Sequence, residues 1–94
     1  MRTVYKYQIE REDITNTEIP KDAVIIHAAM QGGELCIWAI VDPKASLASR
    51  KFIAIGTGQI LPDHQLTHIT TVHDRPYVWH VFEIIKEEEQ EPKL

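Results

Sequence analysis

The sequence contains a run of seven apolar residues, positions 35–41, that follows Gly-Gly-Glu and precedes Asp-Pro. Strands are about 4–8 residues long, whereas buried helices need at least about 10–12, so this run predicts a strand that is covered on both faces. We expect residues 35–43 to form the central strand of the fold. With the strand period of two, one face carries Leu35, Ile37, Ala39 and Val41, and the other carries Cys36, Trp38 and Ile40.

The segment before this run predicts a hairpin. Residues 23–31 are also largely apolar, and Gly32-Gly33 fits the positive φ angles of a type I′ turn. Gln31 should then lie opposite Glu34. Outward from the turn, the expected pairs are Met30–Leu35, Ala29–Cys36, Ala28–Ile37, His27–Trp38, Ile26–Ala39, Ile25–Ile40 and Val24–Val41.

The rest of the chain predicts more strands and one short helix. Residues 3–10 alternate between apolar and polar types, as a strand with one solvated face does. Further strands are expected at residues 14–20, 51–59, 66–73 and 77–85. Asp42-Pro43 favours a helix start, because Asp can accept from free N–H groups and proline is tolerated at the first helical position. We therefore expect one or two helical turns at residues 44–50.

These elements indicate a mainly β fold. Six to seven short strands with at most one short helix predict an antiparallel β-barrel or sandwich. The length of 94 residues allows one domain only. We expect residues 1–85 to form that domain and the acidic residues 86–94 to form a flexible tail, because like charges repel and the tail lacks an apolar pattern.

Charge and hydropathy exclude some classes of partner. The formal net charge of −4 disfavours nucleic acid, because proteins that bind phosphate backbones usually carry a basic face. No apolar run approaches the roughly 18 residues that cross a bilayer, so we expect no membrane association. The first residues lack the apolar segment of a secretory signal, so we predict a cytoplasmic protein. The single cysteine, Cys36, is expected to be a small core residue.

Two of the predicted strands, residues 35–41 and 77–85, are apolar on both faces. A single layer cannot cover both faces of such strands. Exposed apolar patches usually mark interfaces, and a second copy of the chain is the simplest cover. We therefore expect a homo-oligomer, most simply a homodimer.

A glycine-flanked segment is the first candidate site. Gly56, Thr57 and Gly58 follow a predicted strand but lack the remaining residues of a dinucleotide-binding or P-loop motif. One interpretation is a β-bulge or close backbone packing. The other is a ligand that approaches the bare backbone.

Histidines and aromatic residues supply the other candidates. His27 and His80 each share a predicted face with large apolar side chains, where a histidine is either a satisfied core group or a contact to a ligand or partner. Trp38, Tyr77 and Trp79 are candidate anchors for a partner, because large amphipathic rings dominate interface energies.

No catalytic residue, metal site or cofactor is predicted. Ser46 and Ser49 lie in the expected crossover and Cys36 in the core, so no nucleophile with a histidine and an acid can be argued. His64 and His68 would be about 13 Å apart on a strand, with no cysteine or carboxylate to complete a ligand set. Whether the chain is an enzyme stays open.

Five segments carry a resemblance: Val4-Tyr5-Lys6-Tyr7, Glu18-Ile19-Pro20, Trp38-Ala39-Ile40-Val41-Asp42-Pro43, Gly56-Thr57-Gly58 and Trp79-His80-Val81-Phe82-Glu83. In this order, across residues 4–83, they resemble a family of small, mostly uncharacterised proteins encoded by bacteriophages and prophages. The resemblance implies a phage accessory protein. Such small proteins often bind and block host factors, including bacterial defence systems, but the resemblance assigns no role to a particular residue.

Three functional hypotheses follow. The first is a non-enzymatic protein that binds a host protein and inhibits it by occupying its surface, with Trp38, Tyr77 and Trp79 as anchors. The second is a homo-oligomeric sponge that sequesters a nucleotide-type signalling molecule, with phosphates at residues 56–58, a base on an aromatic ring, and charge from His80 or Arg75. The third is a hydrolase of such signals.

Overall fold

The computed structural model describes residues 1–87, which form seven strands and no helix. The strands are β1 (Thr3–Gln8), β2 (Thr15–Pro20), β3 (Val24–Gln31), β4 (Glu34–Val41), β5 (Leu47–Gly56), β6 (Gln65–Asp74) and β7 (Tyr77–Lys86). They pair into two antiparallel sheets: sheet A has the order β1-β4-β3, and sheet B has the order β2-β5-β7-β6. The predicted mainly β class is therefore confirmed.

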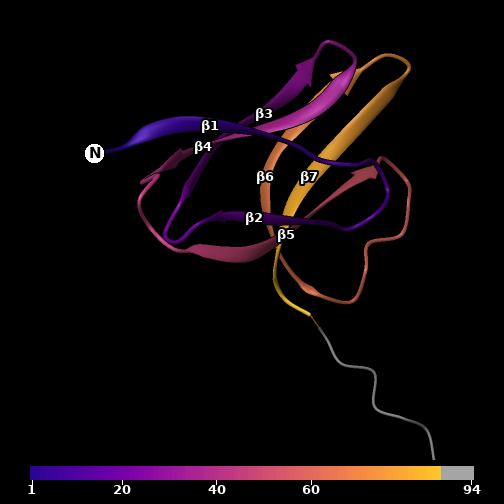
Figure 1. The fold of residues 1–94 in the computed structure, drawn as a ribbon. Coiled ribbons are helices and arrows are strands. Elements are labelled where there is room, and N and C mark those ends of the chain that lie inside the picture. The colour runs from indigo at the N-terminus through magenta and orange to yellow at the C-terminus, as the bar shows by residue number, and fades with distance from the viewer. Residues whose placement is uncertain (88–94) are drawn as a thin grey trace, which may run out of the picture.

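The two sheets form the layers of a sandwich (Figure 1). β3 lies beside β6, and the β3–β4 and β6–β7 hairpins extend in the same direction. Among the described residues no strand ladder joins sheet A to sheet B, so the sandwich alternative holds and no closed barrel forms. The side chains that fill the space between the layers include Ile9, Leu35, Ile37, Phe52, Trp79 and Val81.

β4 is the middle strand of sheet A, as predicted. On its inner face Leu35, Ile37, Ala39 and Val41 are fully buried. On its outer face Cys36 is buried, whereas Trp38 and Ile40 are only partly covered. The predicted central strand is confirmed, but the predicted cover on both faces is only partly found, because the chain itself fully encloses only the inner face.

The β3–β4 hairpin has the predicted turn and most of the predicted register. Gly32 and Gly33 both have positive φ angles, of 58° and 81°. The pairing matches the prediction from Gln31–Glu34 as far as His27–Trp38. Beyond that point it is wrong by one residue, because the strand bulges between Ile25 and His27 and Ile25 instead pairs with Ala39.

The predicted helix at residues 44–50 is wrong. The Asp42 side chain accepts the N–H of Lys44 at 3.0 Å, and the Asp42 carbonyl accepts the N–H of Ala45 at 3.0 Å, which closes a turn. β5 then begins at Leu47, earlier than predicted, and its first half pairs with β2. The strand wins over the helix because β2 supplies a full ladder of backbone partners to this segment.

The predicted β6–β7 hairpin forms, with Asp74 opposite Tyr77. A bulge between His68 and Thr70 leaves Ile69 unpaired and interrupts the simple alternation of faces along β6. Ile69 packs on the core, while His68 lies outside against Phe82, with ring centroids 5.3 Å apart.

β5 and β7 also carry a second apolar cluster, separate from the one between the two sheets. Ile53, Ile55 and Ile84 are buried in this cluster, with Leu66 and Phe82 packed against them.

At the C-terminus β7 continues to Lys86, one residue past the predicted end of the domain. The rest of the predicted flexible tail lies outside the described residues, apart from Glu87.

Candidate functional site

The structure divides the eight predicted site residues into two groups on different sheets. Trp38 and His27 lie on the outer face of sheet A, where their ring centroids are 5.6 Å apart. The second group lies where β5 ends and β7 begins; its members are Gly56, Thr57, Gly58, Tyr77, Trp79 and His80. The sequence therefore identified two separate surfaces and not one site.

The outer face of sheet A is apolar at one end. The register places Val4 and Val24 on either side of Ile40, in one row across the three strands. Val4 is 50% exposed, Val24 is 54% exposed, and Ile26 at the bulge is 49% exposed. We call Val4, Val24, Ile26, Trp38 and Ile40 together the apolar face.

The next rows across sheet A become polar. Trp38 has Lys6 on one side and His27 on the other, and the Lys6 ammonium donates to the Gln31 side chain at 2.6 Å. One row further, the Gln8 amide donates to Glu34 at 2.6 Å beside the buried Cys36. Trp38 thus stands at the border between the apolar face and a polar rim, where its amphipathic ring can contact both.

The glycine-flanked segment is a tight turn at the end of β5. The N–H of Gly56 donates to the Gln59 side-chain oxygen at 2.7 Å, and the N–H of Thr57 donates to the Val78 carbonyl at 3.3 Å. Gly58 has a φ of +88°, a conformation that L side chains rarely adopt. Two of the three N–H groups that a phosphate would need are therefore already occupied, which supports the close-packing interpretation of this segment.

His80 connects this turn to β6 through a row of hydrogen bonds. Its Nε2 is 2.7 Å from the Thr57 hydroxyl, and its Nδ1 is 3.0 Å from the Thr71 hydroxyl. Thr71 in turn is 3.2 Å from Nε2 of His68. We call Thr57, His80, Thr71 and His68 the hydroxyl–imidazole chain; Thr71 and His68 were not among the predicted site residues.

A pocket of about 200 Å³ opens beside this chain. Its lining is mainly apolar, and among the described residues its polar side chains come from Thr57, Gln59 and His80. The lining residues are Ile55, Gly56, Thr57, Gly58, Gln59, Leu61, His80 and Phe82. Small-ligand sites have this character, with an apolar wall and a few convergent polar groups.

Trp79 and Tyr77 differ in exposure although their rings are neighbours, with centroids 5.7 Å apart. Trp79 is only 4% exposed and belongs to the core cluster, with the Arg11 guanidinium carbon 5.9 Å from its ring centroid. Tyr77 is 59% exposed and lines a second pocket, of about 360 Å³. In this structure Trp79 is thus a core residue, whereas Tyr77 is accessible to a partner.

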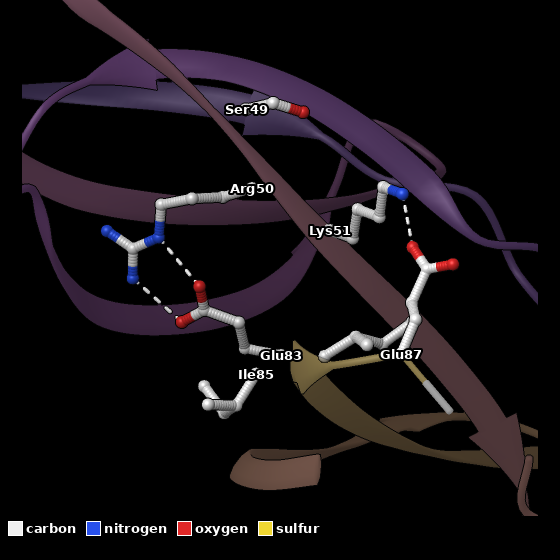
Figure 2. A pocket seen from close by; sticks show the side chains of 7 residues that line it. Ser49, Arg50, Lys51, Glu83, Ile85 and Glu87 are labelled. Carbon is white, nitrogen blue, oxygen red and sulfur yellow. Dashed lines mark hydrogen bonds and ion pairs between the residues drawn. The ribbon is translucent and has the colours of Figure 1, made fainter. Parts of the chain in front are cut away.

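Another pocket, of about 530 Å³, is lined by residues of β5 and β7 and contains an ion pair (Figure 2). The Arg50 guanidinium donates to both carboxylate oxygens of Glu83, at 2.6 and 2.7 Å, and to the Ala23 carbonyl at 2.5 Å. The hydrogen bond to Glu83 raises the pKa of Arg50. Because the guanidinium already has these acceptors, we interpret it as a link between β5, β7 and the segment before β3, and not as a ligand-binding group.

Lys51 and Glu87 form an exposed ion pair at the rim of the same pocket (Figure 2). The hydrogen bond from Lys51 lowers the pKa of the Glu87 carboxyl.

Residues 1–87 contain no group of three or more histidine, cysteine, aspartate or glutamate side chains that could hold a metal ion. In the same part of the chain no helix is long and apolar enough to span a membrane.

No curated protein and no solved structure matches this chain. Residues 1–92 match the model of a protein family described as a domain of unknown function, DUF7352. That match covers nearly the whole chain, so it includes the apolar face, the glycine-flanked turn and His80. The chain therefore belongs to the DUF7352 family.

Proposed function

We propose that this protein is a protein-binding module whose partner covers the apolar face of sheet A. The observation that carries the proposal is the row of Val4, Ile40 and Val24 with Ile26 beside it, which leaves aliphatic side chains about half exposed on sheet A. The large ring of Trp38 lies in the next row on the same face of the sheet. An apolar centre, a large amphipathic ring and a polar rim support the proposal of a protein interface.

The exposed area is large enough to contribute to affinity. Full burial of a valine or isoleucine contributes about 1.5–3 kcal/mol, so covering the exposed halves of Val4, Val24 and Ile26 contributes roughly 3 kcal/mol. That is a factor of about 100 in affinity. Trp38 would add the contribution of an interface anchor.

The partner in this proposal is a protein of the host cell, which the chain inhibits by occupying its surface in the cytoplasm. The support for a host partner is the resemblance to phage-encoded accessory proteins. The expectation of a homo-oligomer stays a separate prediction, because the strand at residues 77–85 is also apolar on both faces and offers a second copy another surface. A second copy on the apolar face would leave it unable to hold a different partner.

The experiment compares immobilised chains in a host lysate. Wild type, Val24→Asp and Trp38→Ala are tested beside Leu47→Asp, which changes an aliphatic side chain that is 63% exposed on β5, in the other sheet. We expect one protein to be retained by wild type and Leu47→Asp and lost with both apolar-face variants. Calorimetry with that purified protein should show Trp38→Ala binding about 30-fold more weakly, which corresponds to about 2 kcal/mol.

Two outcomes would contradict the proposal. In the first, every captured protein binds Val24→Asp as tightly as wild type. In the second, wild type sediments as a dimer and Val24→Asp as a monomer, which would identify the apolar face as a seam between two copies of this chain.

The nucleotide sponge remains a second candidate. It is favoured by the two neighbouring pockets that bring Tyr77, Trp79 and His80 close to residues 56–58. It is weakened by the occupied N–H groups of Gly56 and Thr57. A thermal-shift panel of cyclic and ADP-ribose-type nucleotides tests it, since a ligand at 100 times its Kd stabilises a protein by about 2.7 kcal/mol.

A further inference from the structure

We propose that Thr57 is the nucleophile of an acyl-transfer site, with His80 as its general base. This inference does not depend on the proposed function, because the hydroxyl–imidazole chain lies on sheet B and the turn after β5, whereas the apolar face lies on sheet A. It rests on three features: the geometry of the hydrogen bonds, the exposure of Thr57, and the lining of the 200 Å³ pocket.

The hydrogen bonds have the order of a nucleophile, a base and an orienting group. The Thr57 hydroxyl is 2.7 Å from Nε2 of His80, within reach for proton transfer. Nδ1 of His80 is 3.0 Å from the Thr71 hydroxyl, which fixes the ring orientation. If Thr57 donates to Nε2, then Nδ1–H donates to Thr71 and Thr71 donates to His68, so each group has a consistent role along the row.

The position of Thr57 gives a substrate access to its hydroxyl. Thr57 is exposed, and its neighbours in the turn are glycines without side chains. Gln59 accepts the Gly56 N–H with its side-chain oxygen, so its amide NH₂ group is available as a donor in the pocket. A neutral amide donor of this kind can stabilise the oxyanion that forms when a carbonyl carbon is attacked.

The pocket lining indicates the class of substrate. Its walls are Ile55, Leu61 and Phe82, and the lining that residues 1–87 provide includes no arginine or lysine. Phosphoryl transfer relies on cationic groups or metal ions around the phosphate, whereas acyl transfer needs a base and neutral donors. The site therefore fits an ester or thioester with a short apolar acyl group.

The step balances without a further reagent. The Thr57 oxygen forms a bond to the acyl carbon, its proton passes to Nε2 of His80, and the bond from the acyl carbon to the alcohol or thiol breaks. The leaving group takes that proton from His80, directly or through solvent, so His80 is neutral again before the next step. Water then attacks the acyl-threonine, gives a proton to His80 and releases the acid, and the Thr57 oxygen recovers that proton.

The experiment uses p-nitrophenyl butyrate as the probe on the full chain. We expect a burst of about one nitrophenolate per chain and a butyryl group on Thr57, located by peptide mass spectrometry. Thr57→Ser should retain the burst, and Thr57→Val should abolish it. His80→Asn should slow acylation by about 100-fold or more, since a general base contributes at least that factor.

Thr71 acts as a positioning residue, so its test needs a different readout. Thr71→Val should shift the pH profile of acylation, and Thr71→Ser should restore it, whereas a residue that only supports the fold would leave the profile in place. Circular dichroism of each variant confirms folding. A folded wild type that carries no butyryl group on Thr57, or a folded His80→Asn that acylates as fast as wild type, overturns the proposal.

Discussion

The ion pair between Arg50 and Glu83 gives the sharpest prediction about stability. The two side chains are 23% and 14% exposed, and the guanidinium makes two hydrogen bonds to the carboxylate and one to the Ala23 carbonyl. Arg50→Met keeps an unbranched side chain but removes the charge and all these donors. The Glu83 carboxylate would then be largely buried without its cation.

The expected cost can be worked out from this geometry. Removing one member of a buried pair costs about 3–5 kcal/mol, because the other charge stays desolvated. Partial exposure of both groups lowers the cost, so we expect the lower end, about 3 kcal/mol. For a domain of this size that lowers Tm by roughly 12–24 °C. Replacing both residues by Met should cost less than Arg50→Met alone, because no charge is left unpaired.

Urea and thermal unfolding followed by circular dichroism measure these changes. The matched control is Lys51→Met, which removes the neighbouring ion pair to Glu87 on the same strand. Exposed pairs contribute little, so its midpoint should stay close to that of wild type. The reasoning is refuted if Arg50→Met unfolds at the same midpoint as Lys51→Met, or if the double variant is less stable than Arg50→Met.

Three further predictions concern other parts of the fold. Burial first, and the nearby Tyr5 second, raise the pKa of Tyr7 above 10.0. The contribution of Tyr7 to stability is therefore complete below about pH 10 and is lost as the pH rises through the folded-state pKa. Tyr7→Phe should flatten the alkaline fall in urea midpoint, and Tyr5→Phe should flatten it less. Gly33→Ala should cost about 1–2 kcal/mol in urea unfolding through backbone strain, because φ is +81° and nothing lies within 4 Å of the added carbon. The thiol of Cys36, which is 3% exposed, should react with a disulfide reagent only when the chain opens, and therefore faster in Arg50→Met.

Local sequence patterns were enough to predict most of the strands. The two apolar runs around Gly32-Gly33 predicted the hairpin and its turn, because a two-residue turn with positive φ determines the register next to it. The predicted register is wrong beyond His27 because of the bulge at Ile26. The residues before His27 are all apolar, so no change in an alternating apolar–polar pattern marks this bulge. The bulge at Ile69 was missed because the many threonines of this strand leave no clear alternation between apolar and polar residues.

The helix prediction failed for a different reason. Asp42 does make the side-chain hydrogen bond that was expected of it, to the N–H of Lys44. That bond is the same in a turn and in the first turn of a helix, so it cannot distinguish them. This segment forms a strand because β2 pairs with β5 across about 30 residues of sequence. Local sequence patterns do not predict such long-range pairing.

The candidate site was only partly predictable. Thr57 and His80 were both named from local features, but their 2.7 Å contact joins the turn after β5 to the middle of β7 and depends on the β5–β7 register. Trp79 was named as an anchor because its side chain is large. Both faces of the strand at residues 77–85 are apolar, so the sequence did not show which of them points into the core. Arg50 and Glu83 were missed as a pair because they are 33 positions apart.

The order of the strands affects how the chain emerges from a ribosome. All three strands of sheet A lie within residues 3–41, so this sheet has its complete set of hydrogen-bonding neighbours before β5 has emerged. β2, by contrast, emerges between β1 and β3 and has no ladder until β5 follows. Until β5, β6 and β7 emerge, the nascent chain presents a three-stranded layer with apolar side chains on both sides. At that stage association with other chains is most favourable.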